Sequence, residues 1–219
     1  MDLEKLKKEQ TELSKKLRLI DKIKIEDIKL IAGIDVTYTD IWKNPTTGIA
    51  CIVVLDFQTL NIVETIFAER TVDFPYIPTF LSYRELDPIL KAYDKLTSHP
   101  DLFILDGMGI IHPRKIGIAS HFGVVTNEIS IGCAKSKLIG DFHQPENKRF
   151  SYEPLFVDNE LRGYVLRSKK NTNPIFISPG NNISIESSLK ILMRTIGKYK
   201  LPEPTRLAHN NLQLYRKNY

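Results

Sequence analysis

The stretch DLFILDG (101–107) holds an unbroken apolar run of four residues and then ends on Asp106 and a glycine. A short run that is apolar on both faces is typical of a strand buried inside a parallel sheet, because helices cover both faces of such a sheet. The earlier stretch LIAGIDVTY (30–38) also reads as a strand, and its alternating apolar residues leave Asp35 on the opposite face. Together with the elements around them, these two stretches favour an α/β fold.

The remaining elements alternate around these two strands. Periodicity predicts further strands at 48–57, 60–70, 128–134, 153–157, 161–168 and 174–178, and helices at 2–20, about 80–97, 114–127, 185–197 and after 206. Asp87 and Pro88 form an N-cap followed by a proline at the first helical position, so the main part of the second helix is expected to begin there. The order favours a mixed central sheet with helices on its faces, in one domain over residues 1–219.

Charge is distributed unevenly along the chain. The net charge is +5, and the stretch from Ser188 to the end carries seven Lys or Arg against one acid, Glu203. Such a basic end suits phosphate binding, and equally suits a solvated helix with no ligand. No apolar run is long enough to span a membrane and the N-terminus lacks a secretory signal, so we expect a cytoplasmic protein. The two cysteines, Cys51 and Cys133, are expected to be buried free thiols.

Two aspartates lie on the predicted central strands. Asp35 interrupts an apolar strand, where a carboxylate is costly to bury unless it is paired or binds a cation; the alternative is that its face is exposed to water. Asp106 ends a buried strand, and the carboxyl ends of parallel strands are where sites usually form. The alternative for Asp106 is an ordinary Asp-Gly turn.

A third acid, Glu85, lies in the second predicted helix. It shares helical spacing with apolar residues, so it should be paired, protonated or bound to metal. The alternatives are an ion pair with Arg84 or an exposed helix start. Two or three carboxylates on neighbouring strands and a helix can hold Mg²⁺, which prefers oxygen ligands and promotes phosphodiester hydrolysis.

Basic and imidazole groups near these acids could complete such a site. A phosphate could be held by the basic residues of HPRK and AKSK, which are Arg114, Lys115, Lys135 and Lys137. His112 could transfer a proton, although a lone histidine is more often structural, and the same holds for His209.

The segment FPYIP (74–78) cannot be regular structure, because its prolines fix φ and remove backbone donors. Pro75 and Pro78 would hold Tyr76 and Ile77 rigidly on a loop. A rigid apolar wedge can enter a base stack and help to extrude a nucleotide. The alternative is an aromatic loop folded onto the core.

Several of these stretches occur together in one known family. The chain resembles endonuclease V through motifs that agree in order and spacing, namely AGIDVTY, FPYIPTFLSYRE, DLFILDGMGIIHPRKIGIASHFG, IGCAKSKLIG, NPIFISPG and LPEPTRLAH. The resemblance implies a ribonuclease H-like fold. It also implies hydrolysis of the second phosphodiester on the 3′ side of deoxyinosine, with Mg²⁺ as cofactor and Mn²⁺ able to substitute.

The resemblance also assigns roles to residues. It implies that Asp35 and Asp106 bind metal, that Glu85 completes the acidic site, and that Lys135 and His209 lie close to the scissile phosphate. It further implies nucleic-acid contacts by the PYIP wedge, with Tyr76 at its tip, and a base pocket built around the wedge and backbone groups. The predicted contacts are Pro75, Tyr76, Ile77, Pro78, Gly107, His112, Arg114 and Lys115, with the glycines of GIASHFG near the pocket.

Two departures from the family pattern lie near the expected base pocket. Thr79 follows the wedge where glycine is usual, and Met108 stands where a polar residue is frequent. Both bear on the range of lesions accepted. The expected partner is DNA containing deaminated bases, bound by a monomer. Inosine-containing RNA is an alternative substrate, which a contact to the 2′-OH would decide. A third hypothesis is a module that binds distorted nucleic acid without cutting it.

Overall fold

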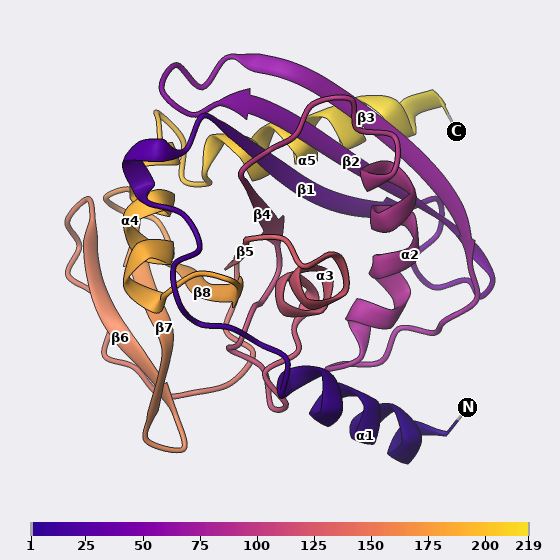
Figure 1. Ribbon diagram of the computed structural model, residues 1–219, viewed down its shortest axis with the longest axis horizontal. Helices are drawn as coiled ribbons and strands as arrows, with labels where there is room; N and C mark the ends of the chain where they lie inside the picture. Colours follow the sequence, from indigo (N-terminus) through magenta and orange to yellow (C-terminus); the bar gives the residue numbers. More distant parts are fainter. Residues whose placement is uncertain (1, 219) are drawn as a thin grey trace.

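The structure is a computed structural model and describes residues 2–218. Its described strands form one sheet in the order β3-β2-β1-β4-β5-β8-β7-β6 (Figure 1). The bounds are β1 Leu30–Tyr38, β2 Thr46–Asp56, β3 Ile62–Val72, β4 Leu102–Asp106, β5 Ser130–Ala134, β6 Ser151–Val157, β7 Glu160–Arg167 and β8 Ile175–Asn181. The pairs β1–β4 and β4–β5 are parallel, whereas the other neighbours are antiparallel. The predicted mixed sheet is therefore confirmed.

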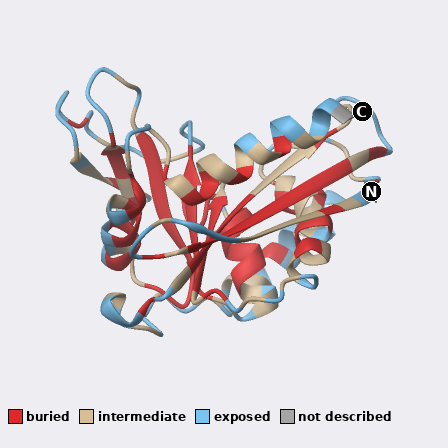
Figure 2. Ribbon diagram, turned by 90° about the horizontal axis from the view of Figure 1, so that it is seen from above, coloured by how far each residue is buried: buried red, intermediate tan, exposed pale blue. Residues whose placement is uncertain are grey.

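Helices cover both faces of this sheet (Figure 2). Their bounds are α1 Leu3–Ser14, α2 Leu81–Tyr93, α3 Ile118–Thr126, α4 Ile185–Thr195 and α5 Glu203–Tyr215, with short 3₁₀ turns at Ile25–Asp27 and Arg216–Asn218. Helices α4 and α5 pack on one face, and α2 and α3 pack on the other. Among the described helices, none combines the length and the apolar character that crossing a bilayer requires.

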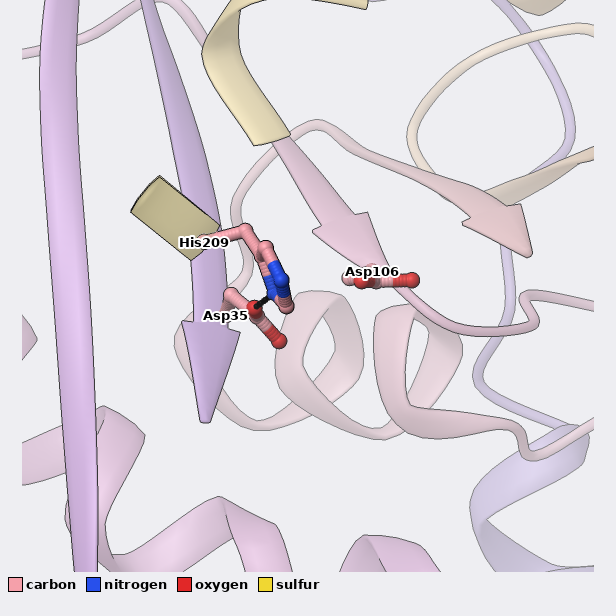
Figure 3. A group of neighbouring side chains, drawn as sticks. All are labelled: Asp35, Asp106 and His209. Atoms are coloured by element: carbon pink, nitrogen blue, oxygen red, sulfur yellow. Dashed lines mark hydrogen bonds and ion pairs between the residues drawn. The ribbon is translucent and has the colours of Figure 1, made fainter. Parts of the chain in front are cut away.

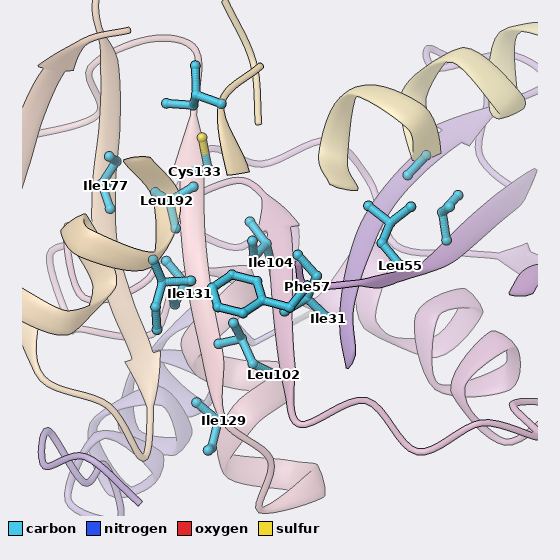
Figure 4. Close-up of a cluster of buried hydrophobic side chains, with 14 of the residues drawn as sticks. Ile31, Leu55, Phe57, Leu102, Ile104, Ile129, Ile131, Cys133, Ile177 and Leu192 are labelled. Carbon is cyan, nitrogen blue, oxygen red and sulfur yellow. The ribbon is translucent and has the colours of Figure 1, made fainter. Parts of the chain in front are cut away.

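The alternation of side chains along each central strand produces two buried cores. Ile31 of β1 points into the core under α4 and α5, which also contains Leu192 of α4 (Figure 4). Leu212 of α5 belongs to the same core. Its neighbours Ala32 and Ile34 point into the other core, under α2 and α3. Because successive side chains of a strand face opposite ways, Asp35 shares the α5 face with Ile31. The two cysteines are buried free thiols, as predicted.

Two helix predictions are wrong at their boundaries. The first helix ends at Ser14 and not near residue 20, because the following backbone bonds elsewhere: the Arg18 amide donates to the Asn181 side chain at 3.0 Å. The helix predicted over 114–127 begins only at Ile118. Lys115 has a left-handed φ of 59°, which a helix does not allow, so the residues before Gly117 form turns.

The second helix does not start at Asp87–Pro88 as predicted. Helix α2 runs without interruption from Leu81 to Tyr93, with Pro88 inside it. Proline removes one hydrogen bond from the helix. Pro88 is buried, and it packs beside Gly48 of β2, where a Cβ would lie 3.3 Å from its ring. Tertiary packing thus overrides the local signal, and Glu85 lies in the same helix as the buried Ile89.

Candidate active site

Asp35 and Asp106 come from neighbouring parallel strands. Ile34 pairs with Leu105 between β1 and β4, so the next residues along the two strands are the aspartates, and β4 ends there. The structure thus brings the two carboxylates together at the carboxyl end of β4 (Figure 3). Asp35 and Asp106 lie together, as predicted, because β1 and β4 are adjacent and pair in this register.

His209 reaches the same place from α5. Helix α5 approaches β1 closely at Gly33, where an added Cβ would lie 2.1 Å from the backbone of Pro204. This contact lets His209 Nδ1 lie 2.8 Å from Asp35 Oδ2 (Figure 3). A carboxylate only accepts hydrogen bonds, so Nδ1 is the donor in this contact and Nε2 is the ring nitrogen that Asp35 does not engage.

Glu85 enters from α2, on the other side of the sheet. It lines a small cleft together with Asp35 and Asp106. Burial, with Asp35 and Asp106 nearby, raises the pKa of Glu85 to about 8. Burial and Asp106 likewise raise the pKa of Asp35 to about 6, although His209 and Lys135 act in the opposite direction. The alternative of a Glu85–Arg84 ion pair does not describe the site, because the Arg84 guanidinium donates to backbone carbonyls.

Lys135 lies beside the acids at the end of β5. Its Nζ donates to Asp106 Oδ2, and its side chain is 41% exposed. Burial alone would lower the pKa of Lys135, but the charge and hydrogen bond of Asp106 raise it above its ordinary value. The ammonium group is therefore charged at neutral pH and partly open to solvent.

The donor set of this site fits a divalent cation. Ligand atoms of Asp35, Asp106 and His209 all lie within 4.8 Å of one another, and Glu85 lies in the adjoining cleft. Carboxylates crowded together raise each other's pKa because their charges repel, and a bound cation would relieve that repulsion. Hard oxygen ligands of this kind suit Mg²⁺ or Mn²⁺.

A cavity of about 260 Å³ opens next to the acids. Its lining joins the wedge to the ends of β4 and β5 and includes Tyr76, Pro78, Thr79, Glu85, Asp106, Gly107, Met108, His112, Gly117 and Lys137. Gly107 has φ of 156°, and a Cβ there would lie 2.5 Å from Ile118, so only glycine leaves this wall open. Thr79 and Met108, the two departures from the family pattern, both line this cavity. Gly123, the second glycine of GIASHFG, lies instead against Ser130.

Three residues predicted to contact nucleic acid form hydrogen bonds or ion pairs with other residues of the protein. His112 is buried: its Nδ1 accepts from the Arg114 amide at 3.2 Å, so its Nε2 donates to the Thr79 carbonyl at 2.9 Å. The Arg114 guanidinium donates to Thr79 and to Gln10. Lys115 forms an ion pair with Glu160 at 2.7 Å.

The internal partners of Arg114 and Lys115 bear on which cations are available to bind a phosphate at the acidic site. His112 lines the cavity, whereas Arg114 and Lys115 are not among the described residues that line it. Lys135 contacts Asp106 and Lys137 lines the cavity, so these two residues supply cations at the site. Direct nucleic-acid binding by His112, Arg114 and Lys115 stays a prediction.

The wedge is an irregular loop between β3 and α2. Tyr76 is 47% exposed and Pro78 is also exposed, whereas Pro75 and Ile77 are half-buried. The end of the loop is held at Thr79, which has a left-handed φ of 68° that is unfavourable for a β-branched residue. The loop therefore projects its aromatic tip outward and does not fold wholly onto the core.

Sequence reasoning missed two residues near the wedge. Gln10 of α1 is buried, and its amide donates to the Thr79 carbonyl at 3.0 Å. Its position in the stripe Leu6–Gln10–Leu13 was an available signal, since a polar residue on an apolar face needs a partner. Trp42, in the loop between β1 and β2, lies beside Tyr76 with ring centroids 6.2 Å apart. No local pattern indicated that second contact.

The strand order and the site together define a class of protein. A mixed sheet with helices on both faces agrees with the ribonuclease H-like fold that the resemblance implied, and the carboxylates gathered at the ends of adjacent parallel strands suit metal-assisted hydrolysis.

Comparison with known proteins specifies the family. The family model for endonuclease V matches residues 11–210. Endonuclease V of Dictyoglomus thermophilum is 46% identical over 200 residues, which is 91% of this chain and 85% of that protein. Endonuclease V of Thermosipho melanesiensis is 43% identical over 94% of this chain and 88% of that protein. The chain belongs to the endonuclease V family and is a nuclease.

Solved structures agree with this assignment. The crystal structure of endonuclease V from Bacillus subtilis superposes with a TM-score of 0.91 at 33% identity, covering 100% of this chain and 95% of that chain. Endonuclease V from Ciona intestinalis, solved in complex with a DNA 24-mer containing an inosine followed by a ribo-adenosine, has a TM-score of 0.86 at 26% identity. That match covers 99% of this chain and 98% of the Ciona chain.

Proposed function

We propose that this chain is a divalent-metal-dependent DNA repair endonuclease that hydrolyses the second phosphodiester on the 3′ side of deoxyinosine. The observation that carries the proposal is the group formed by Asp35, Asp106 and His209, with ligand atoms within 4.8 Å of one another beside a cavity. The Ciona relative, which was crystallised with inosine-containing DNA, supports the choice of lesion.

The acidic residues would hold the metal. Asp35 and Asp106 are the proposed ligands, with Glu85 completing the negative site from α2. A bound Mg²⁺ or Mn²⁺ supplies positive charge that stabilises the negative charge developing on the phosphate. The three carboxylates belong to a β-strand, its parallel neighbour and a helix, so the fold itself sets their separation.

His209 and Lys135 would act on the phosphodiester. Asp35 orients the His209 ring through Nδ1, which leaves Nε2 to accept or return a proton during hydrolysis. Lys135 Nζ is bound to Asp106 and also open to solvent, so the same ammonium group can neutralise a phosphate oxygen. Lys137, on the cavity wall, adds a second cation.

The cavity would receive the deaminated base. Its volume of about 260 Å³ lies just below the ~300 Å³ at which typical ligand pockets begin, which suits one nucleobase. Tyr76 stands at its entrance as the tip of the wedge, and Gly107 keeps the wall next to Asp106 open. A base held there would place the backbone on its 3′ side at the acidic group, so recognition and cleavage would be joined by geometry.

An oligonucleotide assay tests the proposal. A 5′-labelled duplex with one deoxyinosine is incubated with the protein and Mg²⁺, and the product length locates the cut. We expect one product, cut at the second bond 3′ to inosine, and none with EDTA. Asp106→Asn should slow cutting by roughly 100-fold or more, since a buried electrostatic contribution is lost.

The control variant is Asp158→Asn, at the turn between β6 and β7. Asp158 is exposed and has φ of 51°, a conformation that asparagine also adopts, so this change should leave cutting unaltered. Calorimetric titration with Mn²⁺ gives a readout independent of turnover, in which Asp106→Asn binds more weakly than Asp158→Asn. Cutting that persists in EDTA, or that ignores inosine, contradicts the proposal.

A second candidate substrate is inosine-containing RNA. The ribo-adenosine that follows inosine in the Ciona complex motivates this comparison. The proposed metal and phosphate chemistry does not distinguish the two sugars, so only a contact to the 2′-OH can do so. Matched DNA, RNA and single-ribonucleotide strands, cut under the same conditions, measure the preference. Faster cutting of RNA than of DNA would replace the repair proposal with an RNA-directed one.

A further inference from the structure

The loop between β1 and β2 presents a bare aromatic ring next to the wedge. Trp42 is 83% exposed, and its ring lies 6.2 Å from that of Tyr76, at an interplanar angle of 55°. Tryptophan is usually well buried, because its large apolar surface is costly to leave in water. An exposed tryptophan in contact with a residue of the candidate site therefore indicates a binding surface.

The backbone on both sides of Trp42 is held by hydrogen bonds from a buried side chain. The Arg84 side chain is 2% exposed and donates to the Ile41 carbonyl at 3.0 Å and to the Lys43 carbonyl at 3.4 Å. The same guanidinium donates to the Phe74 carbonyl at 2.7 Å, at the start of the wedge. One buried group thus ties the two residues flanking Trp42 to the wedge, so the separation of the loops is built into the fold.

The surroundings of the ring identify its partner as nucleic acid. The surface formed by Trp42 and Tyr76 is continuous with the cavity beside Asp106, because Tyr76 lines that cavity. Lys43 is exposed beside Trp42 and lies 3.7 Å from Asp40, so a cation stands at the edge of the aromatic surface. Two rings flanked by charges are too small an area for a stable protein partner, which needs about 1,000 Å². They match the face of a single base.

We propose that Trp42 is a nucleobase-stacking residue, which binds a base of the cleaved nucleic acid outside the lesion cavity. The proposal rests on the proposed function. The two rings are tilted toward each other and in contact, so a base cannot be sandwiched between them as they stand. The exposed surface of the Trp42 ring receives the base instead, with Tyr76 tilted beside it. Lys43 then lies where it can meet the phosphate of that nucleotide.

The sequence supplies a direct reporter, because Trp42 is the single tryptophan of the chain. Stacking of a base on an indole ring quenches its fluorescence. The intact protein is titrated in EDTA with an inosine-containing duplex, and its intrinsic fluorescence is followed. We expect quenching on binding and protection of the ring from acrylamide in the complex.

Variants separate stacking from other roles. By labelled-oligonucleotide anisotropy, Trp42→Ala should bind roughly 5- to 150-fold more weakly, the range found for loss of one base stack. Trp42→Phe should recover most of this affinity. Tyr152→Ala removes another aromatic residue of 48% exposure, on β6, and should bind as the wild type does. Because Trp42 touches no reacting group, Trp42→Ala should raise KM and leave the single-turnover rate at saturation unchanged.

The outcomes distinguish this inference from the proposed function. If the wild type binds and cuts at inosine while Trp42 fluorescence and Trp42→Ala affinity stay unchanged, the stacking role is wrong and the nuclease proposal stands. If sedimentation shows self-association that Trp42→Ala abolishes, the surface is a contact between copies of the chain, and the inference is overturned. Failure of the wild type to bind or cut any inosine substrate overturns both.

Discussion

Replacement of Gly33 by alanine should separate α5 from the sheet and disturb the active site from a distance. A Cβ at residue 33 would lie 2.1 Å from the carbonyl carbon and oxygen of Pro204, whereas ordinary contact begins at 3.4 Å. The obstructing atoms are backbone, so no side chain can rotate away. The first turn of α5 must retreat by about 1 Å, and His209 lies in the same helix.

Both stability and chemistry should respond to that shift. Overpacking of a well-filled core costs about 1–3 kcal/mol, which in a protein of this size lowers Tm by about 2–12 °C. His209 Nδ1 lies 2.8 Å from Asp35 in the wild type, and that contact lengthens as the helix moves. A misplacement of about 1 Å in a catalytic group can cost about 100-fold in rate.

Thermal unfolding and single-turnover cutting of the inosine duplex measure the two effects. The matched control is Gly197→Ala, where the nearest atom to an added Cβ is a side-chain oxygen of Glu203, at 3.3 Å, and not backbone. We expect the control to unfold and cut like the wild type. If Gly33→Ala also melts with the wild type and cuts at the same rate, the close approach of α5 to β1 does not position His209, and the reasoning is refuted.

Burial lowers the pKa of His121 to about 4, so the folded chain binds fewer protons than the unfolded chain between pH 6.5 and 4. This group should lower the free energy of unfolding by on the order of 3 kcal/mol as the pH falls over that range. Burial lowers the pKa of His112 to about 4 as well, so His121→Phe should lose about half of the combined slope in urea titrations. Gln10→Ala leaves Arg114 Nε without its partner and should cost about 1–3 kcal/mol in urea unfolding, against no change for the exposed Gln213→Ala. Ser184→Ala removes the N-cap of α4 and should cost about 1 kcal/mol by the same measurement, whereas Ser184→Thr keeps a hydroxyl that can still cap the helix and donate to Asp21, and should keep most of the stability.

Each of these has an outcome that contradicts it. A pH slope that is unchanged in His121→Phe would show that His121 does not contribute to the acid sensitivity. Equal stability of the Gln10 and Gln213 variants would mean that α1 does not hold the wedge through that amide. A Ser184→Ala variant as stable as the wild type would show that α4 does not depend on its side-chain cap.

The strands that build the site were predictable because their signals are local. A buried parallel strand is apolar on both faces, so the apolar run predicted the strand at 102–106. The alternation of apolar residues in 30–38 placed Asp35 on the face opposite to Ala32 and Ile34. The resemblance of separated motifs then indicated the acids that would gather. Helix boundaries were less predictable, as α2 shows, because the packing of Pro88 beside β2 is not encoded in its neighbours along the chain.

The wedge region shows where local reasoning ends. Its prolines identified it as a rigid loop, but nothing in FPYIP indicated that Gln10 and Arg114 hold its end at Thr79. Arg114 was expected to meet phosphate, which stays a prediction, and in the fold its guanidinium donates to Gln10 and Thr79. A cation's role depends on which acceptors lie within about 3 Å of it, and that is a property of the folded arrangement.

By itself, the sequence determined the kinds of element and the chemical types at their ends, since periodicity, proline and charge act over a few neighbouring residues. It therefore indicated the mixed sheet and the aspartates at 35 and 106. Only the tertiary structure decided that His209 would form a hydrogen bond with Asp35, which lies 174 positions away in the chain. It likewise decided that Glu85 would line a cleft together with Asp35 and Asp106, and that Trp42 would lie beside Tyr76. Such meetings depend on strand order and on the close packing of helices against the sheet, which no local stretch specifies.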